Sequence, residues 1–249
     1  MWQTLLAVAF WVAVWQGLAV CIGHNGLFLA TPLQTVQTLW RLLPTADFWH
    51  RVGFSALRIL TGFVLAVTVG LLLGACGARW RWFGTLVGPV MQLIRAMPVA
   101  SFVILALLWV SGKNLSVIVS FTHVLPVVYA GTVGGIADTD PALLEMAKVY
   151  RLPLGKRLRY IWLPGMFPSF CENCIAAMGM CWKSGVSAEV IGLPDHSVGD
   201  ALYRAKITIS TPEVFAWTLV IVLLSATLST LAAWALRRAK RALCGEVEG

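Results

Sequence analysis

The sequence predicts an all-α fold, a polytopic bundle of transmembrane helices with about six membrane spans. Composition provides two of the observations: of 249 residues, 59% are hydrophobic and only 12% are charged, and the mean hydropathy is +0.80. The third is the length of the apolar windows. A bilayer core about 30 Å thick is crossed by roughly 20 helical residues, and windows of about this length recur along the chain. A soluble domain does not combine these features.

The apolar windows divide the chain into spans and loops. They cover residues 2–22, 54–78, 83–110, 115–136, 167–186 and 214–236. The first window has no basic segment before it and no A-x-A-like cleavage site, so we interpret it as a retained span rather than a signal peptide. We therefore expect residues 1–249 to form a single transmembrane domain, with its core at residues 54–236.

Two segments are predicted to lie at the membrane interface. Residues 32–43 repeat apolar side chains at helical spacing, Pro32 suits the first turn of a helix, and Pro44 suits its end. Pro98 interrupts the third window, because proline breaks the backbone hydrogen bonding of a helix. We expect that window to begin as an interfacial segment that leads into a span.

The net charge is +8, and the basic residues are distributed as in a membrane protein of defined topology rather than gathered in a nucleic-acid-binding patch. With the N-terminus inside, the inside segments hold more Lys and Arg than the outside ones. The inside set is Arg79, Arg81, Lys148, Arg151, Lys156, Arg157, Arg159, Arg237, Arg238, Lys240 and Arg241. Because cations near span ends favour the cytoplasm, we expect both termini to be cytoplasmic in a multi-pass membrane protein. No nucleic-acid partner is expected.

Residues 137–166, between the fourth and fifth windows, form the sizeable inside loop. An Asp or Thr at positions 138–140 can cap a helix, Pro141 suits its first turn, and Pro153 ends or kinks it. A second short helix with several cations follows. Two interpretations remain open: a basic anchor on anionic lipid headgroups, or a docking helix for a cytosolic partner.

Ionisable residues inside spans are costly and therefore face protein or water. Four are candidates for a polar pathway: Arg95, His123, Lys183 and Glu189. Lys183 and Glu189 form an interfacial ion pair or contact a solute. His123 is a packing residue or a ligand, and Arg95 lies beside the pathway or extends to the inner interface.

Cysteine and histidine spacing offers a rival chemistry. Cys171 and Cys174 match the redox spacing C-x-x-C, which leaves a thiol-redox membrane enzyme as an alternative. The same spacing also places two thiols on one helix face without any chemistry. The histidines are scattered, so we expect neither a metal site nor a catalytic residue.

The central loop also carries a family resemblance. Glu145-Met146-Ala147, followed by Ile161-Trp162-Leu163-Pro164, resembles the Glu-Ala-Ala…Gly…Ile-x-Leu-Pro signature of ABC importer permeases. The Gly of that signature is Arg151 here, and Gly155 is expected to supply the turn instead. The stretches "SALRILTGFVLAVTVGLLLG", "LIRAMPVASFVILALLWVSG" and "MGMCWKSGVSAEVIG" look like the nitrate, taurine and aliphatic-sulfonate branch of type I importers.

The resemblance implies a permease subunit that couples transport to ATP hydrolysis elsewhere. Its implied partners are two ABC ATPase subunits, a second permease copy, identical or related, an extracytoplasmic substrate-binding protein and membrane lipid in the bacterial inner membrane. The implied coupling residues are Glu145, Met146, Ala147, Tyr150, Arg151, Leu152 and Gly155. The sequence has no G-x-x-x-x-G-K-[ST] motif, so no cofactor is expected in this chain, and ATP and Mg are expected on the ATPase.

The substrate class that the resemblance implies is a small, often anionic solute, such as a sulfonate, nitrate or a vitamin precursor. An ion-driven transporter remains an alternative, since both kinds of protein are built from apolar spans. The two differ in whether transport requires a partner ATPase.

Overall fold

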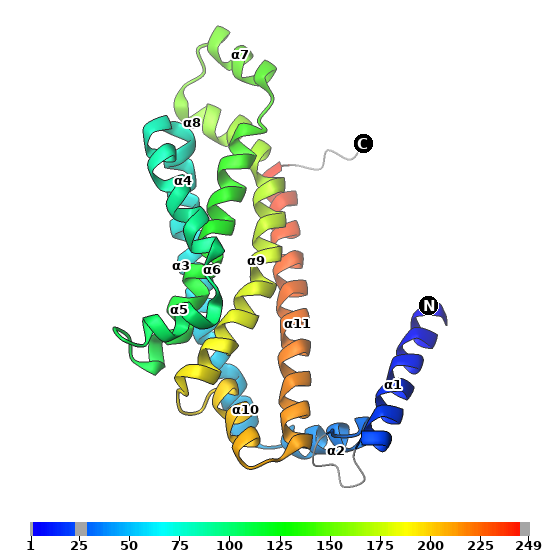
Figure 1. Cartoon of the computed structure of the whole chain (residues 1–249). Helices are drawn as coiled ribbons and strands as arrows, with labels where there is room; N and C mark the ends of the chain where they lie inside the picture. The colour runs from blue at the N-terminus through cyan, green and yellow to red at the C-terminus, as the bar shows by residue number, and fades with distance from the viewer. Residues whose placement is uncertain (1, 23–28, 245–249) are drawn as a thin grey trace.

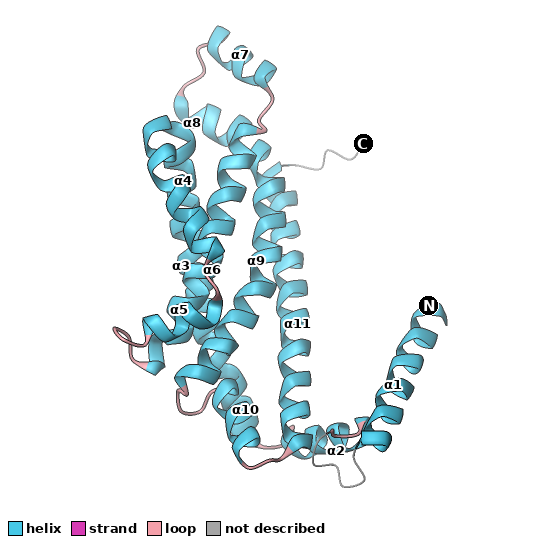
Figure 2. Ribbon diagram, viewed as in Figure 1, coloured by secondary structure: helices cyan, strands magenta, loops and turns pink. Residues whose placement is uncertain are grey.

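The computed structural model describes residues 2–22 and 29–244, and the elements in these ranges are helices (Figures 1 and 2). In chain order they are α1 (Trp2–Ile22), α2 (Pro32–Leu42), α3 (Ala46–Arg79), α4 (Arg81–Ala96), α5 (Val99–Ala106), α6 (Gly112–Ala137), α7 (Pro141–Val149), α8 (Leu154–Arg157), the π-helical turn η1 (Leu158–Trp162), α9 (Leu163–Gly192), α10 (Val198–Ile207) and α11 (Thr211–Cys244). The predicted all-helical fold is confirmed.

Four of these helices, α1, α3, α6 and α11, are long and apolar enough to cross a membrane. The third predicted window is not one straight span, because α4 and α5 meet at an angle of 102° around Pro98. If this bent pair counts as one span, the number is five. The window at 167–186 falls in α9, which is 30 residues long but is not among the helices that are apolar enough to count as a span. Figure 1 shows α9 running beside α6 and α11.

The core is centred on α6, which packs closely against both α3 and α9, whereas α3 and α9 contact each other only slightly. Gly62, Ala66, Gly70 and Gly74 recur every fourth residue on the buried face of α3. A Cβ added at Gly62 would collide with the carbonyl oxygen of Val117 on α6. Small residues at this spacing let two helix backbones approach, which is how helices associate in lipid.

The N-terminal part joins the bundle through few contacts. Thr31 caps α2, as its hydroxyl accepts from the Gln34 N–H and Pro32 follows in the first turn, so the predicted interfacial helix is confirmed as a helix. On α1, Trp15 stacks on Phe215 of α11 at 5.6 Å between ring centroids. Most of α1 is exposed, and the helix leans away from α11 (Figure 1).

The two ends of the bundle differ in what they present. Figure 1 shows α7 projecting at one end, with the C-terminal end of α11 on the same side, while α2 and α10 lie at the opposite end. The N-terminal end of α1 points in the same direction as α7. The loop between α6 and α9 is thus set apart from the bundle.

Candidate functional site

The helix predicted in the central loop is present as α7. The carboxylate of Asp140 accepts from the Ala142 N–H at 2.8 Å, and Pro141 occupies the first turn. This cap satisfies a backbone N–H that the first turn otherwise leaves without a partner. The α7 helix therefore begins where the sequence predicts it.

The end of α7 is a left-handed turn at Arg151, whose φ is +48°. The Leu152 N–H donates to the Ala147 carbonyl at 3.0 Å, and the Arg151 N–H donates to the Lys148 carbonyl at 3.1 Å. Together these two bonds form a Schellman motif, which places its left-handed residue directly after the helix cap. Glycine is the usual residue in that position, because a Cβ is strained there.

The expectation that Gly155 supplies the turn is wrong. Gly155 lies in α8, its φ is outside the left-handed range, and an added Cβ would meet nothing within 4 Å. The turn is at Arg151 instead, at the very position where the resembled signature has glycine. Because the residue at this turn is arginine and not glycine, the sequence contained no signal that the turn lies there.

One side of α7 is apolar and exposed. Met146 is 42% exposed, Val149 78% and Tyr150 73%, whereas Ala147 is buried. At 100° per residue, Met146 and Tyr150 lie on one face, and Glu145 and Lys148 are displaced toward the other side. We call Leu143, Met146, Val149 and Tyr150 the apolar face of α7. A projecting helix with such a face fits a groove on another protein.

The return from α7 to the bundle is packed. Ile161 in η1 is buried, and the Arg157 guanidinium lies over the Trp162 ring at 5.0 Å. The Ile-x-Leu-Pro part of the loop therefore joins α7 to the start of α9 through fixed side chains.

At the opposite end, Glu189 is fully buried and holds three helices together. Its carboxylate accepts from the Ser55 hydroxyl of α3 at 2.7 Å and from the Gly199 N–H of α10 at 3.3 Å. Ser55 in turn accepts from the Val198 N–H at 2.9 Å. Of the two alternatives predicted for Lys183 and Glu189, the structure does not form the ion pair, because Lys183 is exposed on another side of α9.

An ion-pair cluster lies beside this site and was not predicted from the sequence. Asp200, which is buried, binds Arg51 of α3 at 2.9 Å and Arg204 of its own helix at 2.8 Å. Arg51 also pairs with Asp47 at 2.6 Å. The sequence offered no signal for it, since Arg51 and Asp200 are far apart along the chain. The cluster fixes α10 against α3.

The remaining pathway candidates separate by exposure. His123 contacts Phe102 with ring centroids 6.4 Å apart, and its Nδ1 lies 3.0 Å from the Val119 carbonyl. Arg95, in the last turn of α4, and Lys183, on α9, are both exposed. His123 is thus partly buried and Glu189 fully buried, whereas Arg95 and Lys183 are exposed.

The Cys171–Cys174 pair lies on the packed side of α9, and both thiols are buried. A thiol-redox enzyme needs its cysteines accessible to a partner, so this alternative is not favoured. Over the part of the chain that the structure describes, no group of three or more His, Cys, Asp or Glu residues is arranged to hold a metal ion.

A projecting helical loop on a bundle of membrane-spanning helices defines a class of transport subunit, and comparison with known proteins identifies it. The model of the family described as binding-protein-dependent transport system inner membrane component matches residues 52–243. The chain belongs to this family and is the permease component of a type I ABC importer.

Individual relatives extend the comparison. The nitrate import permease of Synechococcus elongatus is 23% identical over 92% of this chain and 86% of its own length. The taurine transport system permease of Escherichia coli is 23% identical over 97% of this chain and 89% of its own length. A crystal structure of an amino acid ABC transporter with histidines is 21% identical, with a TM-score of 0.50 over 78% of this chain and 99% of that chain, and supports the fold.

Proposed function

We propose that this permease carries a small anionic solute across the membrane, and that α7 couples its movement to a separate ATPase. The observation that carries the coupling role is the apolar face of α7 on a helix set apart from the bundle. Apolar side chains exposed to water on one helix face mark a binding surface. The proposed coupling residues are those predicted from the sequence apart from Gly155, namely Glu145, Met146, Ala147, Tyr150, Arg151 and Leu152.

The mechanism follows from how α7 is held. The Asp140 cap and the Arg151 turn make α7 a short rigid unit, and η1 joins it to α9. When two ATPase subunits close around ATP, movement at the apolar face passes through η1 into α9. Since α9 packs on α6 and α11, its movement shifts the bundle between outward and inward access.

The solute class is argued from charge. Arg95 and Lys183 are exposed cations on membrane-embedded helices, and a cation in a bilayer costs about 2.5 to 3.5 kcal/mol unless it faces water or a counter-charge. A water-filled pathway that carries an anion would give these cations both water and a counter-charge. The relatives named for nitrate and taurine transport support the same class, with a sulfonate as the leading candidate.

Partners and topology complete the proposal. A second permease copy closes the pathway against the exposed side of α9, and an extracytoplasmic binding protein docks at the end where α10 lies. The proposed orientation places α7 and both termini in the cytoplasm. This orientation is supported by the arrangement in Figure 1, where the N-terminal end of α1 and the C-terminal end of α11 point toward the same end of the bundle as α7.

Co-purification of the ATPase tests the coupling role. We expect Met146→Asp and Tyr150→Asp each to lower the amount of ATPase recovered with the permease, because a buried unpaired charge weakens an apolar interface. Glu145→Lys should lower it as well, since it reverses a charge beside that face. Lys148→Ala, on the other side of α7, is the matched control and should recover normal amounts.

Two results would contradict this proposal. Full ATPase recovery with Met146→Asp and Tyr150→Asp would remove α7 as the docking element. Transport that follows a proton or sodium gradient without ATP would favour the ion-driven alternative.

A further inference from the structure

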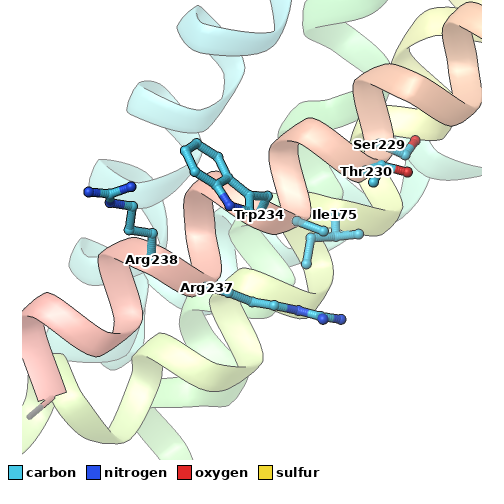
Figure 3. A pocket seen from close by; sticks show the side chains of 7 residues that line it. Ile175, Ser229, Thr230, Trp234, Arg237 and Arg238 are labelled. Atoms are coloured by element: carbon cyan, nitrogen blue, oxygen red, sulfur yellow. The ribbon is translucent and has the colours of Figure 1, made fainter. Parts of the chain in front are cut away.

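The inner end of α11 and the neighbouring face of α9 enclose a groove that the transport role does not use. Its volume is about 860 Å³, and Figure 3 shows the side chains that line it. They are Ile175 of α9 and Ser229, Thr230, Ala233, Trp234, Arg237 and Arg238 of α11. We call it the α9/α11 groove.

The depth of the groove in the bilayer follows from the length of α11. From Val214 to Trp234 the helix rises about 30 Å, which is the thickness of the hydrocarbon core. Trp234 therefore lies at the edge of the core, where indole rings are enriched. Arg237 and Arg238 follow within one turn, at the depth of the phosphate groups. The lower part of the groove lies among acyl chains.

The positive charge of the groove has no acidic partner among the residues that the structure describes. Neither Arg237 nor Arg238 forms an ion pair with an acidic side chain of the described residues. The Arg238 guanidinium lies over the Trp234 ring at 5.5 Å, which holds it while leaving its N–H edge available. Figure 3 shows the two guanidinium groups on opposite sides of α11, with Arg237 extending toward the side of Ile175. A phosphodiester in the groove therefore meets the planar guanidinium of Arg237, which can bind it through paired hydrogen bonds, while Arg238 adds positive charge at the headgroup depth.

The lower part of the groove suits hydrocarbon. The Thr230 hydroxyl donates to the Ala226 carbonyl of its own helix at 2.8 Å, so its methyl group, with Ile175 and Ala233, offers an apolar wall. A cationic upper part above an apolar lower part matches a lipid, whose headgroup and chains are joined in one molecule. A free anion would use only the upper part.

We propose that the α9/α11 groove is a binding site for an anionic phospholipid, with Arg237 on the phosphodiester, Arg238 adding positive charge beside Trp234, and Trp234 beside the glycerol. Basic pockets between transmembrane helices are the usual sites for such headgroups. The site is independent of the transported solute and of α7. It gives the otherwise weakly buried α11 a lipid that bridges it to α9.

Native mass spectrometry of the full-length chain in detergent tests this inference, with phosphatidylglycerol as the probe and phosphatidylcholine as the neutral comparison. We expect the wild type to retain phosphatidylglycerol preferentially. Arg237→Gln with Arg238→Gln should reduce retention about thirtyfold, since each cation near the surface contributes about 1 kcal/mol. Arg237→Lys with Arg238→Lys should restore part of it.

The matched control is Arg79→Gln with Arg81→Gln, which removes the same charge at the α3–α4 junction, outside the groove. This variant should retain phosphatidylglycerol as the wild type does. Equal losses in the two double variants would reduce the effect to general charge and overturn the site. Unchanged retention after Arg237→Gln with Arg238→Gln would overturn it as well.

Two further experiments distinguish a bound phospholipid from a soluble anion and from a second copy of the chain. Millimolar inorganic phosphate should leave the lipid bound, and displacement would show a soluble-anion site instead. A photo-crosslinking phenylalanine analogue at Trp234 should capture a phospholipid in the membrane. Capture of a second copy of the chain would assign the groove to a subunit interface and overturn the proposal.

Discussion

At the scale of single residues, Arg151 shows how a local strain is fixed by its surroundings. Its left-handed backbone is imposed by the two hydrogen bonds that close α7. Residues other than glycine lose roughly 1 kcal/mol or more in this conformation. The turn persists because α7 would otherwise leave two carbonyls without partners.

Replacing Arg151 therefore has a predictable direction. Arg151→Gly should stabilise the turn by about 1 kcal/mol, and Arg151→Val should destabilise it, since a β-branched residue is poorly tolerated at positive φ. Hydrogen exchange of residues 141–152 measures this, with slower exchange expected for Arg151→Gly and faster exchange for Arg151→Val. Slower exchange in the valine variant would contradict the assigned turn.

At the scale of elements, the close contact between α3 and α6 depends on glycines, because a larger side chain at these positions would hold the two helices apart. Gly70 and Gly74 face Val128 and Thr132, where an added Cβ would lie 2.9 Å and 2.6 Å from the Cβ atoms of those side chains. At Gly62 the obstacle is a backbone carbonyl, which cannot turn aside as a side chain does. Along the contact between α3 and α6, the approach is therefore closest at Gly62.

Gly62→Ala should lower the melting temperature of the solubilised protein, because α3 and α6 must separate to admit the methyl group. The expected cost is about 1 to 3 kcal/mol. Gly53→Ala is the matched control on the same helix, since an added Cβ there meets nothing within 4 Å. It should raise stability by up to about 1 kcal/mol. Equal effects of the two changes would disprove close packing at Gly62.

At the scale of the whole molecule, the two ends of the bundle have different tasks. Glu189 and Asp200 brace α10 against α3 and α9 at one end, while α7 projects at the other (Figure 1). A firmly held end and a projecting helix suit a permease that binds a delivery protein on one side and an ATPase on the other.

The proposed pathway role of Lys183 is tested in proteoliposomes that contain the permease, its ATPase and its binding protein. Lys183→Gln should reduce ATP-dependent uptake of an anionic solute about tenfold, in line with the loss of one charge contact, and Lys183→Arg should retain most of it. ATPase co-purification should be unchanged in both. Normal uptake with Lys183→Gln would exclude Lys183 from the pathway.

The sequence by itself determined the features that local patterns specify. Apolar windows long enough for a bilayer predicted the helical membrane fold, Asp140 and Pro141 predicted the start of α7, and the Glu145-Met146-Ala147 signature predicted the permease family, which the family match confirmed. These features depend on residues close together in the chain, and their physical causes act over one or two helical turns.

Only the tertiary structure decided how distant residues meet. It placed Glu189 in a buried contact with Ser55 and Gly199 rather than in an ion pair with Lys183, set the angle of the predicted break at Pro98 to 102°, and moved the turn from Gly155 to Arg151. Each outcome depends on which helix faces lie together, because a buried carboxylate takes the donors that packing brings within reach. The residue pattern along one helix does not show which other helices pack against it.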